Sequence, residues 1–102
     1  MSRAQISQHA AGHLQLSGEI DYLSGPALRE QGRRLIASNS SKTLVLDCSG
    51  VTRSSSVGLA LLLAFMRDAK AAGCECSIKA LPAELAEIAK VCGALEILPL
   101  QA

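Results

Sequence analysis

The stretch that decides the fold is residues 44–63, LVLDCSGVTRSSSVGLALLL. Residues 43–48 are apolar on both faces, which is typical of a central strand of a parallel sheet that is covered on both faces. The serine-rich residues 49–56 are then expected to form a loop. An apolar segment follows and predicts a helix over residues 57–72, with Gly73 as its C-terminal cap. A strand, a loop and a helix in this order indicate the start of a strand–helix–strand crossover.

Upstream of this stretch, alternating apolar and polar residues predict a pair of strands joined by a tight turn at Ala11-Gly12. A helix then begins near Ser24, the candidate N-cap, with Pro26 in its first turn. Its apolar stripe consists of Leu28, Leu35 and Ile36, and its outward face carries Arg29, Glu30, Arg33 and Arg34.

Downstream, the alternation of residues 75–80 predicts another half-exposed strand. Pro82 opens a last helix, which Gly93 closes. The apolar stripe of this helix consists of Leu85, Ile88, Ala89 and Cys92. Residues 96–98 follow as a short final strand at the edge of the sheet. We therefore expect one α/β domain over residues 1–102, a mixed β-sheet flanked by helices in the order β-β-α-β-α-β-α.

The composition of the chain excludes several classes of function. Its 102 residues are 49% hydrophobic and 19% charged, as in one packed domain. Ten Lys and Arg against nine Asp and Glu give a net charge of +1, too little for a general nucleic-acid binder. One Tyr, one Phe and no Trp leave no aromatic platform for bases. We expect no nucleic-acid partner and a function that depends on a local site.

No segment of the sequence predicts targeting or membrane insertion. The N-terminus lacks the apolar stretch of a signal peptide, and residues 57–66 are about half of the roughly 20 needed to span a bilayer. A cytoplasmic protein is expected, in which Cys48, Cys74, Cys76 and Cys92 remain reduced. The one-residue spacing between Cys74 and Cys76 matches no zinc or redox motif, so we expect no metal and no cofactor.

Ser54, Ser55 and Ser56 stand at the expected start of the central helix. Their hydroxyls can cap free backbone N–H groups, and the positive end of the helix dipole attracts an anion or a phosphate. The residues alone favour plain capping. The helix itself has no polar face over residues 59–66, so it is either buried in the core or exposes an apolar patch for a partner.

Two segments resemble the STAS domain family, which includes bacterial anti-sigma-factor antagonists and the STAS subunits of membrane transporters. One is residues 46–63, LDCSGVTRSSSVGLALLL. The other is residues 16–21, LSGEID, which is similar to the turn that leads into the family's first helix. The resemblance covers nearly the whole chain. Residues 58–63 are most similar to the small STAS subunit of an ABC phospholipid transporter.

The family motif is placed on this chain through Gly58 and Leu59. Antagonists of the family have an Asp and two hydroxyl residues before this Gly-Leu pair, and the first hydroxyl is phosphorylated. The resemblance therefore implies that Ser56 is the phospho-acceptor position, with Ser55 in place of the Asp and Val57 in place of the second hydroxyl. The missing Asp argues against recognition by a partner-switching serine kinase. In the transporter subunits the hydroxyl at this position engages the ATPase.

The resemblance implies a non-catalytic subunit that binds and stabilises or activates the ATPase of an ABC phospholipid transporter, which maintains outer-membrane lipid asymmetry. Such a subunit would lie at the inner membrane through the ATPase and its permease, without inserting into the bilayer. The expected partner-binding residues are Ser54, Ser55, Ser56, Val57 and Gly58, with Arg29 and Arg33 as a charged rim. The alternative is an anti-sigma-factor antagonist controlled by phosphorylation of Ser56.

The residues do not predict an enzyme. His9 and His13 lie in or near the first hairpin, far in sequence from the serines. Asp47 can approach the serine loop, but a lone carboxylate is a poor activator of serine. The sequence also contains no Gly-Lys-Ser phosphate-binding motif, so we do not expect the chain to bind ATP.

Overall fold

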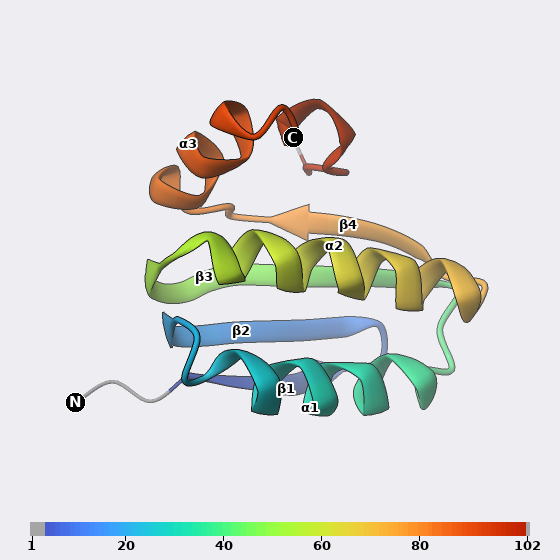
Figure 1. The fold of residues 1–102 in the computed structure, drawn as a ribbon. Coiled ribbons are helices and arrows are strands. Elements are labelled where there is room, and N and C mark those ends of the chain that lie inside the picture. The colour runs from blue at the N-terminus through green and yellow to red at the C-terminus, as the bar shows by residue number, and fades with distance from the viewer. Residues whose placement is uncertain (1–3, 102) are drawn as a thin grey trace.

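The computed structural model describes residues 4–101 and shows a four-stranded sheet in the order β1-β2-β3-β4. The long helices lie on one side of this sheet (Figure 1). The elements are β1 (Gln5–Ala10), β2 (His13–Ile20), α1 (Gly25–Ala37), β3 (Thr43–Ser54), α2 (Ser56–Ala71), β4 (Glu75–Lys79), α3 (Ala83–Val91) and the short 3₁₀ helix η1 (Leu95–Ile97). β1 and β2 are antiparallel, whereas β2, β3 and β4 run parallel. The predicted α/β fold and element order are confirmed.

The predicted turn between the first two strands is present at Gly12. Its φ is +74°, a conformation that glycine adopts without steric cost. A Cβ at this position would lie 2.5 Å from the backbone oxygen of Thr43, so glycine also permits the close approach of the next strand. The turn therefore joins the hairpin to the parallel part of the sheet.

The hydrophobic core lies between the sheet and the helices. Phe65 of α2 is fully buried and contacts α1 at Gly32, where a Cβ would lie 2.3 Å from the phenyl ring. This close approach fixes the spacing of the two long helices, which lie side by side in Figure 1. The buried apolar residues of the strands beneath them are Ile6, Leu14, Leu16, Ile20, Leu44, Leu46, Cys48 and Ile78.

The prediction that residues 43–48 are covered on both faces is wrong. β3 is central and parallel to both neighbours, as expected, and Leu44 and Leu46 are buried under the helices. Asp47 points to the opposite face, where its carboxylate accepts a hydrogen bond of 2.9 Å from the Ser49 N–H and lies 3.5 Å from Nε2 of His13. On this face of β3, Ser49 and His13 contact the Asp47 side chain where a second layer of helices was expected.

The predicted loop over residues 49–56 is also wrong, because β3 continues to Ser54. Its last residues pair with β2, so that Arg53 lies opposite Glu19 and Ser54 opposite Ile20. Gly50 allows this pairing, since a Cβ there would lie 2.8 Å from the Cβ of Ser17. Residues 49–54 are mostly small or polar and therefore lack the apolar pattern of a strand. The register shifts against β2 also disturb the alternation of apolar and polar residues along β3.

Three further expectations need correction. Residues 96–98 do not form a strand: η1 covers most of them, and Leu100 instead makes a parallel bridge with Ile78. Cys92 is exposed, because α3 ends at Val91. Ser24 occupies the N-cap position of α1, but its side chain makes no capping hydrogen bond, and its hydroxyl accepts the Asp21 N–H instead.

The apolar helix α2 combines the two alternatives that its sequence left open. Most of its apolar residues are buried: Leu59, Leu61, Leu62, Ala64, Phe65 and Ala69. Ala60 is exposed, and Leu63 and Met66 are half-buried, so a narrow apolar strip faces outward. Within residues 4–101, no helix is long and apolar enough to cross a membrane.

Candidate partner-binding site

The three serines occupy three different environments at the junction of β3 and α2. Ser54 ends the strand, the residue is only 7% exposed, and its hydroxyl donates to the backbone oxygen of Ser55 at 2.9 Å. The Ser55 N–H donates to the Ile20 oxygen at 3.0 Å. Ser54 is therefore a structural residue of the loop, and its hydroxyl is held by the backbone of the chain itself.

Ser55 is the N-cap of α2. Its backbone is extended, and its hydroxyl oxygen accepts a hydrogen bond of 3.2 Å from the Val57 N–H. Ser56 is the first helical residue, and its exposed hydroxyl has no hydrogen-bond partner among residues 4–101. Capping thus occupies Ser55 and leaves Ser56 open to another molecule.

Gly58 allows the serine loop to pack closely against its neighbours. A Cβ at this position would lie 2.1 Å from the Ser54 hydroxyl and 3.1 Å from the Leu85 side chain. Since Gly58 is buried, its expected role as a contact residue is replaced by a packing role. Glycine allows the first turn of α2 to sit directly against the end of β3 and against α3.

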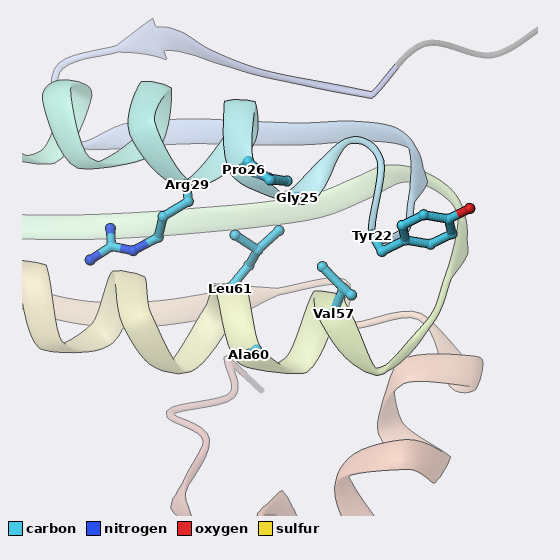
Figure 2. Close-up of a pocket in the computed structure, with 7 residues that line it drawn as sticks. All are labelled: Tyr22, Gly25, Pro26, Arg29, Val57, Ala60 and Leu61. Carbon is cyan, nitrogen blue, oxygen red and sulfur yellow. The ribbon is translucent and has the colours of Figure 1, made fainter.

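An apolar groove of about 340 Å³ runs beside the loop, between the first turns of α1 and α2 (Figure 2). Its lining consists of Tyr22, Gly25, Pro26, Arg29, Val57, Ala60 and Leu61. Val57 reaches across to α1, because a Cβ on Gly25 would lie 2.8 Å from its side chain. Tyr22 is 76% exposed at the open end of the groove, and its neighbour Leu23 is 75% exposed. Among residues 4–101 five large apolar side chains are exposed, and Tyr22 is the one of them that lines this groove.

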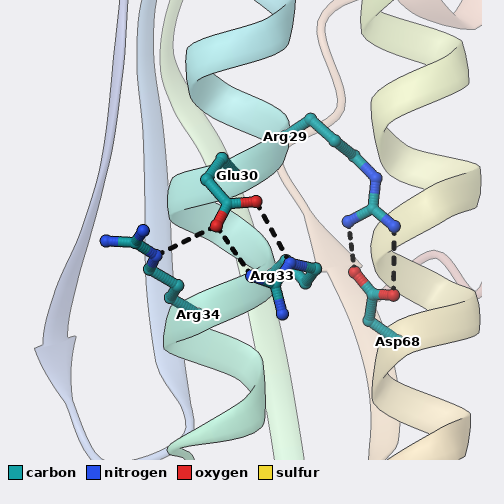
Figure 3. A network of polar contacts seen from close by, with 5 residues as sticks. All are labelled: Arg29, Glu30, Arg33, Arg34 and Asp68. Carbon is teal, nitrogen blue, oxygen red and sulfur yellow. Dashed lines mark hydrogen bonds and ion pairs between the residues drawn. The ribbon is translucent and has the colours of Figure 1, made fainter.

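Of the two arginines expected at the rim, only Arg29 lines the groove. Both terminal nitrogens of its guanidinium donate to the carboxylate of Asp68 on α2, and Figure 3 shows the pair bridging the two helices. Arg33 turns away and binds Glu30 at 2.7 Å, next to Arg34. These two arginines hold the pKa of Glu30 at about 2. Arg33 therefore belongs to a solvated face of α1.

On the other side of the serine loop lies a polar hollow of about 260 Å³. Its lining is Glu19, Ile20, Asp21, Arg53, Ser54, Ser55 and Glu84. Oε1 of Glu84, in the first turn of α3, accepts the Ser54 N–H at 2.7 Å. Glu84 is not identified as a site residue by the sequence analysis, because no local pattern connects it with a strand thirty residues upstream. Tyr22 was missed for the same reason.

The expected approach of Asp47 to the serine loop does not occur, since the extension of β3 separates them by six residues. Burial raises the pKa of Asp47, but hydrogen bonds from Ser49 and His13 outweigh burial and leave it below its ordinary value. Asp47 instead lines a small hollow with His9, His13 and Gln15. In the described part of the chain, no cluster of His, Cys, Asp and Glu has a geometry that would hold a metal ion.

Comparison with known families agrees with this fold. The family model described as "Mlab, STAS domain" matches residues 4–99. The chain belongs to the STAS domain family. The resemblance of its central motif is thereby confirmed over almost the full length of the chain.

Solved STAS structures have the same fold. An anti-sigma-factor antagonist from Mycobacterium paratuberculosis superposes with a TM-score of 0.76 at 26% identity, covering 98% of this chain and 85% of that one. The antagonist SpoIIAA in its unphosphorylated form gives 0.73 at 15% identity, covering 98% and 89%. A STAS domain protein from Planctomyces limnophilus gives 0.74 at 15% identity, covering 98% and 91%. This chain is therefore a STAS domain whose structural neighbours are anti-sigma-factor antagonists.

Proposed function

We propose that this STAS domain is a non-catalytic subunit that binds the ATPase of an ABC phospholipid transporter, and stabilises or activates it. The observation that carries the proposal is the pairing of an exposed, unbonded Ser56 hydroxyl with an apolar groove next to it. The description of the matching family model as an Mlab STAS domain supports the transporter class. In this role the protein serves the maintenance of outer-membrane lipid asymmetry.

The contact surface that we assign to the ATPase consists of Ser56, Val57 and Ala60 on α2, with Tyr22 and Arg29 across the groove. Tyrosine and arginine are among the residues that supply most of the binding free energy in many interfaces. Arg29 is already held by Asp68, so it reaches the interface with less loss of side-chain entropy. Binding here would keep the subunit cytoplasmic and at the inner membrane through the ATPase and its permease.

The second candidate function is an anti-sigma-factor antagonist regulated by phosphorylation of Ser56. Its support is the structural similarity to SpoIIAA in both its unphosphorylated and its phosphorylated form. Ser56 also lies at the N-terminus of a sixteen-residue helix, where the dipole favours a phosphate. Against it stands Ser55, which caps the helix where antagonists carry the Asp of their motif.

A pair of matched substitutions tests the site. Ser56→Glu places a charge and extra bulk at the centre of the proposed contact and should weaken binding of the ATPase at least about tenfold, roughly 1.4 kcal/mol. Ser40→Glu is the control, because Ser40 is an exposed serine in the loop between α1 and β3, at the opposite end of the sheet. The measurement is the dissociation constant of purified protein and ATPase.

Thermal unfolding should change little in either variant, since both side chains are exposed. Normal ATPase binding by Ser56→Glu would show that the contact lies elsewhere. Intact-mass analysis of the protein from its own cells addresses the alternative, because a phosphorylated fraction that fails to bind its partner would favour the antagonist.

A further inference from the structure

The Ser54 N–H, at the end of β3, is a hydrogen-bond donor that the sheet does not use. The ladder between β3 and β4 ends with Asp47 opposite Lys79, whereas β3 continues to Ser54. On the β2 side, the Ser55 N–H reaches the Ile20 oxygen. Because successive N–H groups of a strand point to alternate sides, the Ser54 N–H points toward the side that β4 has already left.

The carboxylate of Glu84 takes the place of the missing strand. Its Oε1 accepts the Ser54 N–H at 2.7 Å, which is the distance of a charge-assisted hydrogen bond. Glu84 stands in the first turn of α3, where the helix dipole stabilises a negative charge. The next residue, Leu85, is 1% exposed and packs near Gly58, so the helix that carries Glu84 is itself held in place.

From this geometry we infer that Glu84 is a positioning residue for the serine loop. It binds the backbone N–H of Ser54, so that the Ser55 hydroxyl can cap α2 and the Ser56 hydroxyl stays exposed. The loop is thus fixed from two sides, by β2 through Ser55 and by α3 through Ser54. The position in which Ser56 is presented to a partner therefore depends on α3, although no residue of α3 lines the apolar groove. The expected effect of Glu84 on ATPase binding rests on the proposed function.

Three variants of the full chain test this role. Glu84→Ala removes the acceptor, Glu84→Gln keeps a side-chain oxygen at the same reach, and Glu87→Ala is a control one turn later on α3. Glu87 is exposed and has no hydrogen-bond partner among residues 4–101. The readouts are hydrogen exchange of the Ser54 amide, followed by NMR, and the dissociation constant for the ATPase.

Glu84→Ala should speed exchange of the Ser54 amide and weaken ATPase binding, each by about tenfold, since a hydrogen bond to a charged group is lost. Glu84→Gln should restore both to within about threefold of the wild type. Glu87→Ala should change neither. Circular dichroism on each variant verifies that the fold is retained.

Unchanged Ser54 exchange in Glu84→Ala would overturn the inference, whatever the ATPase does. Equal loss of binding in Glu84→Gln and Glu84→Ala, with exchange restored only by Gln, would also overturn it, because the carboxylate would then contact the partner directly. If the wild-type protein does not bind the ATPase at all, the proposed function fails, and the amide exchange alone decides whether Glu84 positions the loop.

Discussion

Identical residues acquire different roles at this site because their surroundings differ. Ser54 is buried and holds the loop, Ser55 caps α2, and Ser56 faces solvent. The sequence predicted a capping serine at this helix start but not which one, since three consecutive serines carry the same local signal. Only the length of β3 and the close packing of Gly58 separate them.

The cysteines are a second case in which burial assigns the chemistry. Burial raises the pKa of Cys48 to about 12 and that of Cys76 to about 11, so neither thiol ionises near neutral pH. Cys92 is exposed at the end of α3. With a thiol-alkylating reagent at pH 8, Cys92 should react first and Cys48 last, by at least about a hundredfold in rate.

Peptide mapping of the alkylated protein over time measures this order. The control is the same reaction in denaturant, where all four thiols should react at similar rates. Early labelling of Cys48 in the native protein would contradict the burial that the fold assigns to β3.

Among the elements, the first turn of α2 packs closely against β3 and α3 because residue 58 is a glycine and has no Cβ. Gly58→Ala should destabilise the protein by about 1–3 kcal/mol, because the added methyl would lie 2.1 Å from the Ser54 hydroxyl. The free energy of unfolding, measured by urea denaturation, gives this value. The displacement of the serine loop by the added methyl should also change the hydrogen-exchange rate of the Ser55 amide.

A double substitution gives the matched control. Ser54→Ala removes the clashing hydroxyl, so Gly58→Ala combined with Ser54→Ala should cost less than the two single changes added together. Strict additivity would mean that the contact between Gly58 and Ser54 is not tight, and that this account of the loop is wrong.

Periodicity in the sequence predicted most of the elements and failed where tertiary contacts decide. The helices and the paired strands carry regular apolar spacing, and their order is confirmed. The end of β3 lacks this spacing, because its strand character depends on pairing with β2 and on the close approach at Gly50. Residues 96–98 are apolar enough for a strand, but the bridge to Ile78 comes later, at Leu100.

At the scale of the whole molecule, the candidate site draws on segments that are far apart in the chain. The motif of residues 54–58 marks the loop at its centre, and the structure brings Arg29 into the groove beside that loop. Tyr22 and Glu84 arrive through the packing of α1 and α3 against α2, which no local pattern reveals. A single sequence therefore indicates where such a site begins, whereas the fold determines which surfaces complete it.

If this STAS domain binds the ATPase of an ABC transporter, the complex should survive purification. The decisive experiment is affinity purification of the tagged protein from its own cells, with mass-spectrometric identification of what stays bound. We expect an ABC ATPase together with its membrane permease, both lost from a parallel purification of Ser56→Glu. Recovery of a serine kinase that controls a sigma factor, with no transporter component, would refute the transporter function and establish the antagonist function.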